Sequence, residues 1–146
     1  MASNKKKTDE SQYIDSKSIS LVKTFFSKVK SGKYENALDE LLAQNINIDL
    51  KDSLTLSLKN KFLNINKSSG KFMSYRLILK KSLGNDLGVY SYIVKYDKKF
   101  YRFLFTFYNN ESEVNIYKFS FDDTIDLEME ESLRLYLNNE NYSIRQ

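Results

Sequence analysis

The chain has 146 residues and a net charge of +4, and it contains no cysteine, histidine, proline or tryptophan. Its hydrophobic fraction of 41%, with 14% aromatic residues, predicts one folded domain with a real core rather than a disordered chain. Without Cys or His, the sequence excludes disulfide frameworks, Ser-His-Asp and Cys-His catalysis, and zinc sites built from these ligands. We expect no cofactor and no metal site.

The charge is unevenly distributed along the chain. Residues 18–121 hold seventeen basic and nine acidic residues, whereas residues 122–146 hold two arginines and seven acids. A basic body with an acidic end is compatible with nucleic-acid binding. The lysines are scattered, however, and no Arg-rich or RNP-like run is present. The favoured interpretation is therefore that the acidic end packs against a basic body, its own or that of a partner subunit.

The first seventeen residues, MASNKKKTDESQYIDSK, are polar and lack apolar periodicity, which predicts a disordered leader. No apolar run approaches the roughly 18–20 residues of a membrane span, and no signal peptide is present. The segment Ser3–Glu10 resembles the tether that follows the lipidated cysteine of mature bacterial lipoproteins. This resemblance implies a lipid-anchored protein of the bacterial envelope or periplasm, with Met1-Ala2 replacing a signal peptide and the cysteine. An ordinary ragged N-terminus is the alternative, with a cytoplasmic location.

Three amphipathic helices are predicted next, from about Ser16 to Lys30, from Tyr34 to Leu42 and from about Ser53 to Asn66. Ser31-Gly32 ends the first helix, and Asn45 to Asp49 alternates like an extended connector. The residues expected to face inward are Ile19, Val22, Phe25, Phe26 and Val29, then Tyr34, Ala37, Leu38, Leu41 and Leu42, then Leu54, Leu58, Phe62 and Ile65.

From Lys71 to Asp122 the apolar period changes from 3.6 to 2, which predicts four antiparallel strands in a meander. The most strand-like of them is Phe100–Tyr108, and its two apolar faces both require a cover. Strands of roughly ten residues predict a long, curled sheet with a bulge or two. In the first strand, one face is expected to hold Met73, Tyr75, Leu77 and Leu79.

The C-terminal part fits two patterns. Ile125, Leu127 and Met129 alternate as in a strand. A helical stripe also fits, and it is formed by Ile125, Met129, Leu133, Tyr136 and Leu137. The helix is favoured, from about Asp126 to Leu137, on the open side of the sheet. The predicted organisation is a leader over residues 1–17, one domain over 18–137 and a frayed tail over 138–146.

The segment LVKTFFSKVKSGKYENALDELL, followed by a curled meander, resembles the opening of the NTF2-like (cystatin-like) α+β cone superfamily. Gly32, Tyr34, Ala37 and Leu41 match that opening, and the resemblance extends from about Ser18 to Asp122. It is nearest to small uncharacterised bacterial domains of the secreted or lipoprotein type. It implies an α+β fold in which three N-terminal helices pack on a curled four-stranded antiparallel sheet. It also implies a cone that binds ligands or partners, and a sheet that supports a homodimer.

The favoured function is a non-catalytic domain that binds a small apolar ligand or a protein partner and dimerises through its sheet. A small isomerase or lyase is one alternative, and nucleic-acid binding by the basic body is another. The isomerase would need a carboxylate base and a Tyr or protonated acid inside an apolar cavity. The four acids among the predicted strands lie at turns instead, at Asp86, Asp97, Glu111 and Glu113. No catalytic residue is predicted.

The candidate ligand-binding residues are Tyr75, Arg76, Tyr92, Tyr101 and Arg102. The two arginines are the only ones in the helix–sheet body, and both lie among apolar neighbours, which suggests an anionic ligand. The plainer interpretation is an outward strand position with the stem packed and the head in water. The tyrosines likewise fit either a ligand platform or ordinary sheet surface and core.

Overall fold

The computed structural model describes residues 2–125 and 133–134. Its elements in chain order are α1 (Ala2–Lys30), α2 (Tyr34–Ala43), α3 (Ser53–Ser68), β1 (Phe72–Leu83), β2 (Leu87–Tyr96), β3 (Phe100–Asn109) and β4 (Val114–Asp122). The predicted order of three helices followed by a four-stranded antiparallel meander is confirmed. Of the predicted C-terminal helix and tail, all but Leu133 and Arg134 lie outside the described residues.

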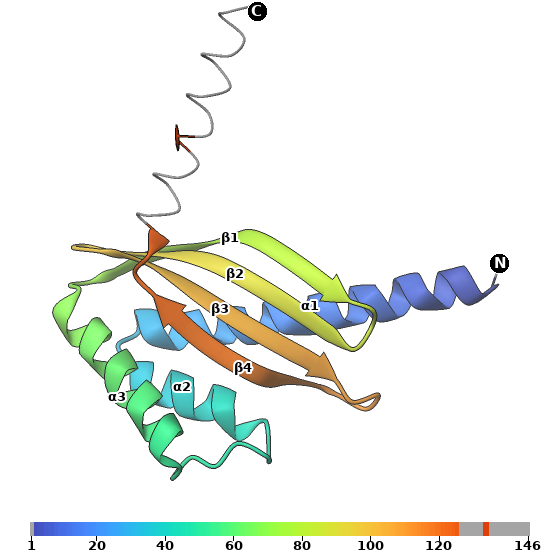
Figure 1. Cartoon of the computed structure of the whole chain (residues 1–146), viewed down its shortest axis with the longest axis horizontal. Coiled ribbons are helices and arrows are strands. Elements are labelled where there is room, and N and C mark those ends of the chain that lie inside the picture. Colours follow the sequence, from blue (N-terminus) through green and yellow to red (C-terminus); the bar gives the residue numbers. More distant parts are fainter. Residues whose placement is uncertain (1, 126–132, 135–146) are drawn as a thin grey trace, which may run out of the picture.

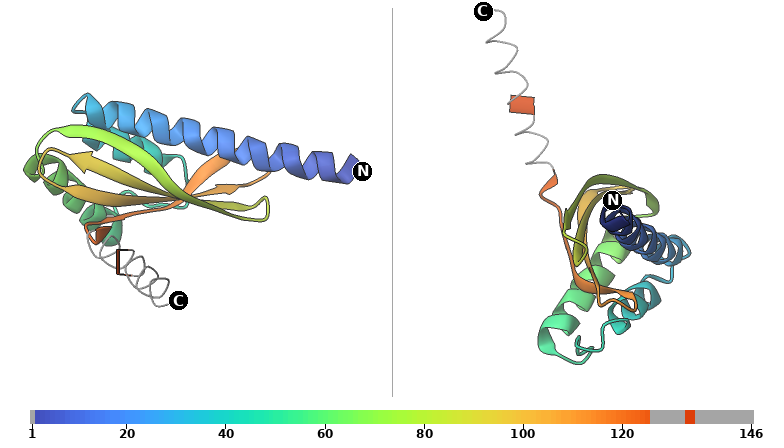
Figure 2. Two further views of the ribbon diagram at one scale, coloured as in Figure 1. Left: turned by 90° about the horizontal axis from the view of Figure 1, so that it is seen from above. Right: turned by 90° about the vertical axis from the view of Figure 1, so that its right-hand side faces the viewer.

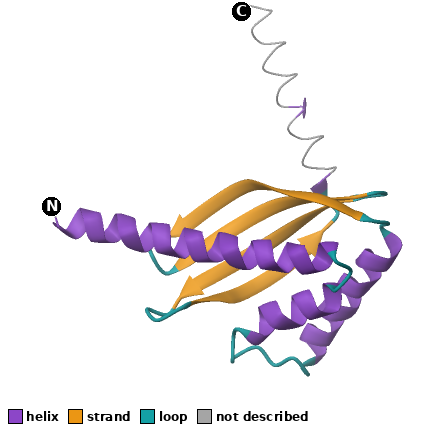
Figure 3. Ribbon diagram, turned by 180° about the vertical axis from the view of Figure 1, so that it is seen from behind, coloured by secondary structure: helices purple, strands orange, loops and turns teal. Residues whose placement is uncertain are grey.

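The strands form one curled sheet in the order β1-β2-β3-β4, with every pair antiparallel (Figure 1). Helix α1 runs along one face of this sheet, which we call the helix-facing side (Figure 3). Helix α2 packs on α1, and α3 packs on α2. Seen from above in Figure 2, α1 and the sheet form two layers. In the described part of the chain no element lies over the opposite side of the sheet, which we call the outer face.

Phenylalanine rings fill the space between α1 and the sheet. In β3, alternate side chains point toward the helices, and Phe103, Phe105 and Phe107 are completely buried. Phe25 of α1 meets the ring of Phe105 at a centroid distance of 5.4 Å, and Phe26 meets the ring of Phe103 at 5.7 Å. The first pair is edge-on and the second is stacked, and ring pairs of both kinds stabilise a core beyond their buried area. The alternation predicted for β3 is confirmed on this side.

The corner between α1 and α2 depends on Gly32, as predicted. Its φ of 81° is a left-handed conformation that glycine adopts without strain. The Gly32 N–H donates to the Val29 carbonyl at 3.0 Å, and the Lys33 N–H donates to the Lys28 carbonyl at 2.8 Å. These bonds satisfy carbonyls at the end of α1 and turn the chain directly into α2.

Bulges alter which side chains share a face in β1. The register with β2 shifts between Phe72 and Ser74 and again between Leu77 and Leu79. Each shift inverts the alternation, so Phe72 reaches the ring of Phe26 on the helix-facing side. Leu79 is instead 66% exposed. The prediction of bulges is confirmed, but the predicted shared face that included Met73 and Leu79 is wrong, since both are exposed.

Helix α1 begins at Ala2, whereas a disordered leader was predicted over residues 1–17. That part of the prediction is wrong, because Ile14 is completely buried and extends the inward stripe of α1 toward the N-terminus. The intervening inward residue is Ser18, whose polar side chain hides the stripe from an apolar pattern. Ile19, which was expected to face inward, is exposed. No helix in the described part of the chain is long and apolar enough to cross a membrane.

Two further expectations about the helical layer are wrong. Leu54 was expected to be buried but is 79% exposed at the start of α3. The segment from Asn45 to Asp49 was expected to be extended, yet it forms turns in which the Ile48 N–H donates to the Asn45 carbonyl at 3.0 Å. The buried Asn45 side chain accepts from the Asn47 N–H at 2.9 Å within this turn, and it donates to the carbonyl of Ile116 in β4 at 3.0 Å.

Candidate functional site

The five predicted ligand-binding residues do not form one site. Tyr75, Tyr92 and Tyr101 lie on the helix-facing side of the sheet, where each contacts other buried rings or hydroxyls. Arg76 and Arg102 lie on the outer face, opposite Ile93 in the neighbouring strand β2. The plainer interpretation of the arginines, an outward strand position, agrees with this placement.

Tyr92 and Tyr101 belong to the core, whereas Tyr75 is 37% exposed at its edge. The ring of Tyr75 stacks on Phe26 with centroids 4.2 Å apart. Tyr92 is buried, and burial, together with the nearby Tyr75 and Asp15, raises its pKa to about 12. The hydroxyls of Tyr101 and Ser69 lie 2.5 Å apart and share a hydrogen bond. These contacts agree with the plainer interpretation of the tyrosines as sheet surface and core.

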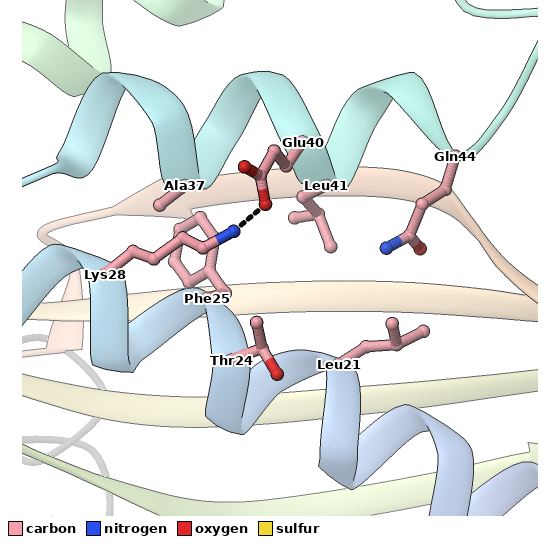
Figure 4. A pocket seen from close by; sticks show the side chains of 8 residues that line it. All are labelled: Leu21, Thr24, Phe25, Lys28, Ala37, Glu40, Leu41 and Gln44. Atoms are coloured by element: carbon pink, nitrogen blue, oxygen red, sulfur yellow. Dashed lines mark ion pairs between the residues drawn. The ribbon is translucent and has the colours of Figure 1, made fainter.

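The space between α1 and α2 is narrow (Figure 4). The cavity there has a volume of about 30 Å³, enough for one or two water molecules but not for an organic ligand. The Lys28 and Glu40 side chains form an ion pair across it. The side-chain carbonyl of Gln44 is buried at its edge and has no hydrogen-bond partner among the described residues.

The geometry does not support the isomerase or lyase alternative. Such a site needs an apolar cavity with an acid whose pKa is raised, whereas rings fill the core between α1 and the sheet. Among the described carboxyl groups with a displaced pKa, those of Asp15, Asp122 and Asp123 all move downward. In the same part of the chain, no group of three or more acids could hold a metal ion.

A polar cluster that the sequence did not reveal ties α1 to the sheet. The Tyr90 hydroxyl donates to one carboxylate oxygen of Asp15 at 2.5 Å, and the Lys80 ammonium donates to the other at 2.6 Å. Burial raises the pKa of Tyr90, and the hydrogen bond to Asp15 raises it further. Lys80 points toward α1 because the second bulge of β1 inverts the alternation of side chains along the strand. The position of such a bulge cannot be read from the sequence. The cluster anchors the helix.

The outer face is the remaining candidate for function. Cross-strand pairing places Arg76, Ile93, Arg102 and Asp122 in one row across the four strands. The next row contains Leu79, Ser91, Leu104 and Ser120. Ile93 and Leu104 are partly exposed at the centre, while Leu79 and Phe100 are exposed beside them. Arg102 forms an ion pair with Asp122 at 3.2 Å.

Basic side chains surround this apolar centre. The exposed ones are Arg76, Lys81, Lys95 and Lys118, and each lies on an outward position of its strand. Asp122 is the carboxylate in these outward rows, and Arg102 already pairs with it. The outer face therefore combines an apolar centre with a positive periphery.

Comparison with known proteins found a similarity to one solved structure that is itself of unknown function. No protein-family model matches the chain, and no curated protein matches it. Among solved structures, the chain is similar to an NTF2-like protein of unknown function from Silicibacter pomeroyi. The two are 12% identical with a TM-score of 0.48, and the match covers 73% of this chain and 92% of the other.

Proposed function

We propose that the chain is a non-catalytic NTF2-like domain that acts by binding protein, and that its outer face binds a second copy of itself. The observation that carries the proposal is the exposed apolar centre of that face. Leu79 is 66% exposed and Phe100 is 46% exposed, on a broad sheet surface that no other described element covers. Contiguous apolar patches of this kind on a soluble domain usually mark interaction sites.

A small apolar ligand, the other half of the predicted function, finds less support. The natural place for it is the cone between helices and sheet. There Phe26 contacts the rings of Phe72, Tyr75 and Phe103 at centroid distances of 4.2–5.8 Å. Packing of this density leaves no room for a ligand.

The positive periphery gives the dimer a diagnostic dependence on salt. Two outer faces brought together juxtapose like charges from Arg76, Lys81, Lys95 and Lys118 of each copy. Salt screens this repulsion and strengthens apolar association, so the dimer should tighten as ionic strength rises. Nucleic-acid binding by the same side chains would respond in the opposite way, because phosphate contacts weaken with salt.

The test is the oligomeric state by sedimentation equilibrium at low and high salt, with two matched variants. Leu79→Lys places a charge in the apolar centre of the outer face, and Leu54→Lys places one on α3, at a leucine that is 79% exposed. We expect a wild-type dimer, weakened at least about tenfold by Leu79→Lys and unchanged by Leu54→Lys. A wild type that stays monomeric at both salts, or two variants with equal effects, would overturn the proposal.

The location in a bacterial envelope through a lipid anchor stays a prediction from residues 3–10, with the cytoplasm as the alternative. The gene sequence upstream of these residues tests it. An apolar segment that ends in cysteine supports the lipid anchor, and its absence removes the reason for proposing one.

A further inference from the structure

A pocket at one end of the sheet is not used by any feature described above. It has a volume of about 440 Å³ and lies where the β1–β2 turn, the ends of β3 and β4 and the segment after α2 come together. This volume is in the range of small-molecule sites. Its walls include Tyr108, Tyr117, Asp86, Asn47, Asn109 and Leu87. We call it the Tyr108–Tyr117 pocket.

A bulge in β4 exposes one of the two aromatic walls. Thr106 pairs with Lys118 and Phe107 pairs with Ile116, so Tyr117 is an extra residue without a partner in β3. Bulges of this kind redirect a side chain, and they are common next to functional sites. Tyr117 is 60% exposed as a result. Its ring lies 6.1 Å from that of Tyr108 at an angle of 77°, which makes the two rings nearly perpendicular walls.

The polar groups of the pocket are acceptors and amides, without a cation. Asp86 is exposed, and the Asn109 N–H donates to its backbone carbonyl at 2.9 Å, which fixes the β1–β2 turn against β3. No described residue forms an ion pair with the Asp86 carboxylate. The pocket lining contains no lysine or arginine. Asp86 is therefore the one charged residue in the lining of this pocket, and it lies beside two tyrosine rings.

We infer that the Tyr108–Tyr117 pocket binds an alkylammonium group. The faces of tyrosine rings attract ammonium groups, and aromatic walls of this kind recognise choline and methylated lysine. Asp86 supplies the balancing charge and disfavours anions. A neutral ligand would cover that carboxylate without pairing it, which is unfavourable. The ammonium group could belong to a free quaternary amine or to a lysine side chain of another protein, and the chemistry is the same.

The test is titration of the full chain, followed by amide NMR shifts, with choline and with its neutral isostere in which carbon replaces nitrogen. A peptide carrying trimethyl-lysine and the same peptide with acetyl-lysine form the second arm. We expect shifts at Asp86, Tyr108 and Tyr117 with the cationic ligands alone. Tighter binding of choline indicates a free amine, and tighter binding of the trimethyl-lysine peptide indicates a protein source.

Variants of exposed residues sharpen the test, since they should leave the fold intact. Tyr117→Ala and Asp86→Asn should each weaken binding at least about tenfold, whereas Leu54→Lys, on α3, should leave it unchanged. Leu79→Lys should also leave it unchanged, so failure of the proposed dimer does not affect this result. Equal binding of choline and its neutral isostere, no response of the pocket, or unchanged affinity in Tyr117→Ala and Asp86→Asn would overturn the inference.

Discussion

The hydrogen bond between Tyr90 and Asp15 provides a direct measure of how firmly α1 is joined to the sheet. Tyr90 is 1% exposed, and its hydroxyl donates to a carboxylate that also accepts from Lys80. Tyr90→Phe removes the donor and leaves Asp15 partly hydrated, so we expect a loss of about 1.5 kcal/mol of unfolding free energy. Asp15→Ala leaves a buried hydroxyl without its acceptor and should cost about 2–3 kcal/mol. Lys80, which is half-exposed, contributes less than about 1 kcal/mol of that loss.

A double-mutant cycle separates this bond from the other effects of each substitution. Once Asp15 is absent, Tyr90→Phe removes a buried hydroxyl that has lost its acceptor, so the double variant should be at least as stable as Asp15→Ala. The expected coupling energy is about 1–2 kcal/mol, measured by urea unfolding at neutral pH. Tyr13→Phe, on an exposed face of the same helix, is the control and should change stability by less than about 0.5 kcal/mol. A coupling energy near zero would refute the anchoring of α1.

The same bond has a predictable dependence on pH. Burial acts to raise the pKa of Asp15, but hydrogen bonds from Lys80 and Tyr90 outweigh it, and the pKa lies below its ordinary value of 3.8. A carboxyl with a depressed pKa in the folded state stabilises the protein above its unfolded pKa. That contribution is lost as pH falls through the folded value. The coupling should therefore be constant near neutrality and decline only below about pH 3.8.

Three further predictions concern the core, a tight corner and alkaline pH. Phe103→Ala should lower the unfolding free energy measured in urea by about 3–5 kcal/mol, because removal of a completely buried ring leaves a cavity. A decrease below about 1 kcal/mol would contradict the close packing of the core. Gly70 and Gly32 share a φ of 81°, but an added Cβ would lie 2.8 Å from the Asp97 side chain at Gly70 and would meet no atom within 4 Å at Gly32. Gly70→Ala should therefore lower the unfolding free energy clearly more than Gly32→Ala does, and equal losses would refute the clash. The pKa of Tyr92 is raised to about 12, so the unfolding free energy should fall as pH rises above 10. Tyr92→Phe should reduce the slope of unfolding free energy against pH by up to about 1.4 kcal/mol per pH unit. An unchanged slope would count against burial of this hydroxyl.

Much of the fold could be predicted because its signals are local. Gly32 marks a helix end whose φ only glycine adopts freely, and strict alternation in β3 separates Phe103 and Phe105 from Arg102 and Leu104. The bulges of β1 could not be placed, since a register shift depends on which partner residues pack best across the strands. The start of α1 was missed for a similar reason. Ser18 is buried through tertiary contacts that a pattern of apolar residues does not record.

The candidate site was mispredicted for a different reason. Tyr75 and Arg76 are neighbours in one strand, and so are Tyr101 and Arg102, so alternation alone places each pair on opposite faces. Chemical type suggested one ligand site, although the geometry of a strand argued against it. Tyr117 had no sequence signal beyond its type, because the bulge that exposes it becomes visible only from the pairing of β3 with β4.

The outer face of β3 depends less on a covering element than its sequence pattern suggests. Its helix-facing rings are completely buried, whereas Arg102, Leu104 and Thr106 on the outer side are only partly buried and are flanked by charged groups. Burying the exposed parts of Leu79, Ile93, Phe100 and Leu104 would yield roughly 1 kcal/mol each, or about 4 kcal/mol per copy. Association costs about 4–15 kcal/mol in lost freedom, and the like charges add to that cost. The dimer should therefore be reversible and depend on concentration and salt, as suits a surface used for binding rather than one required for folding.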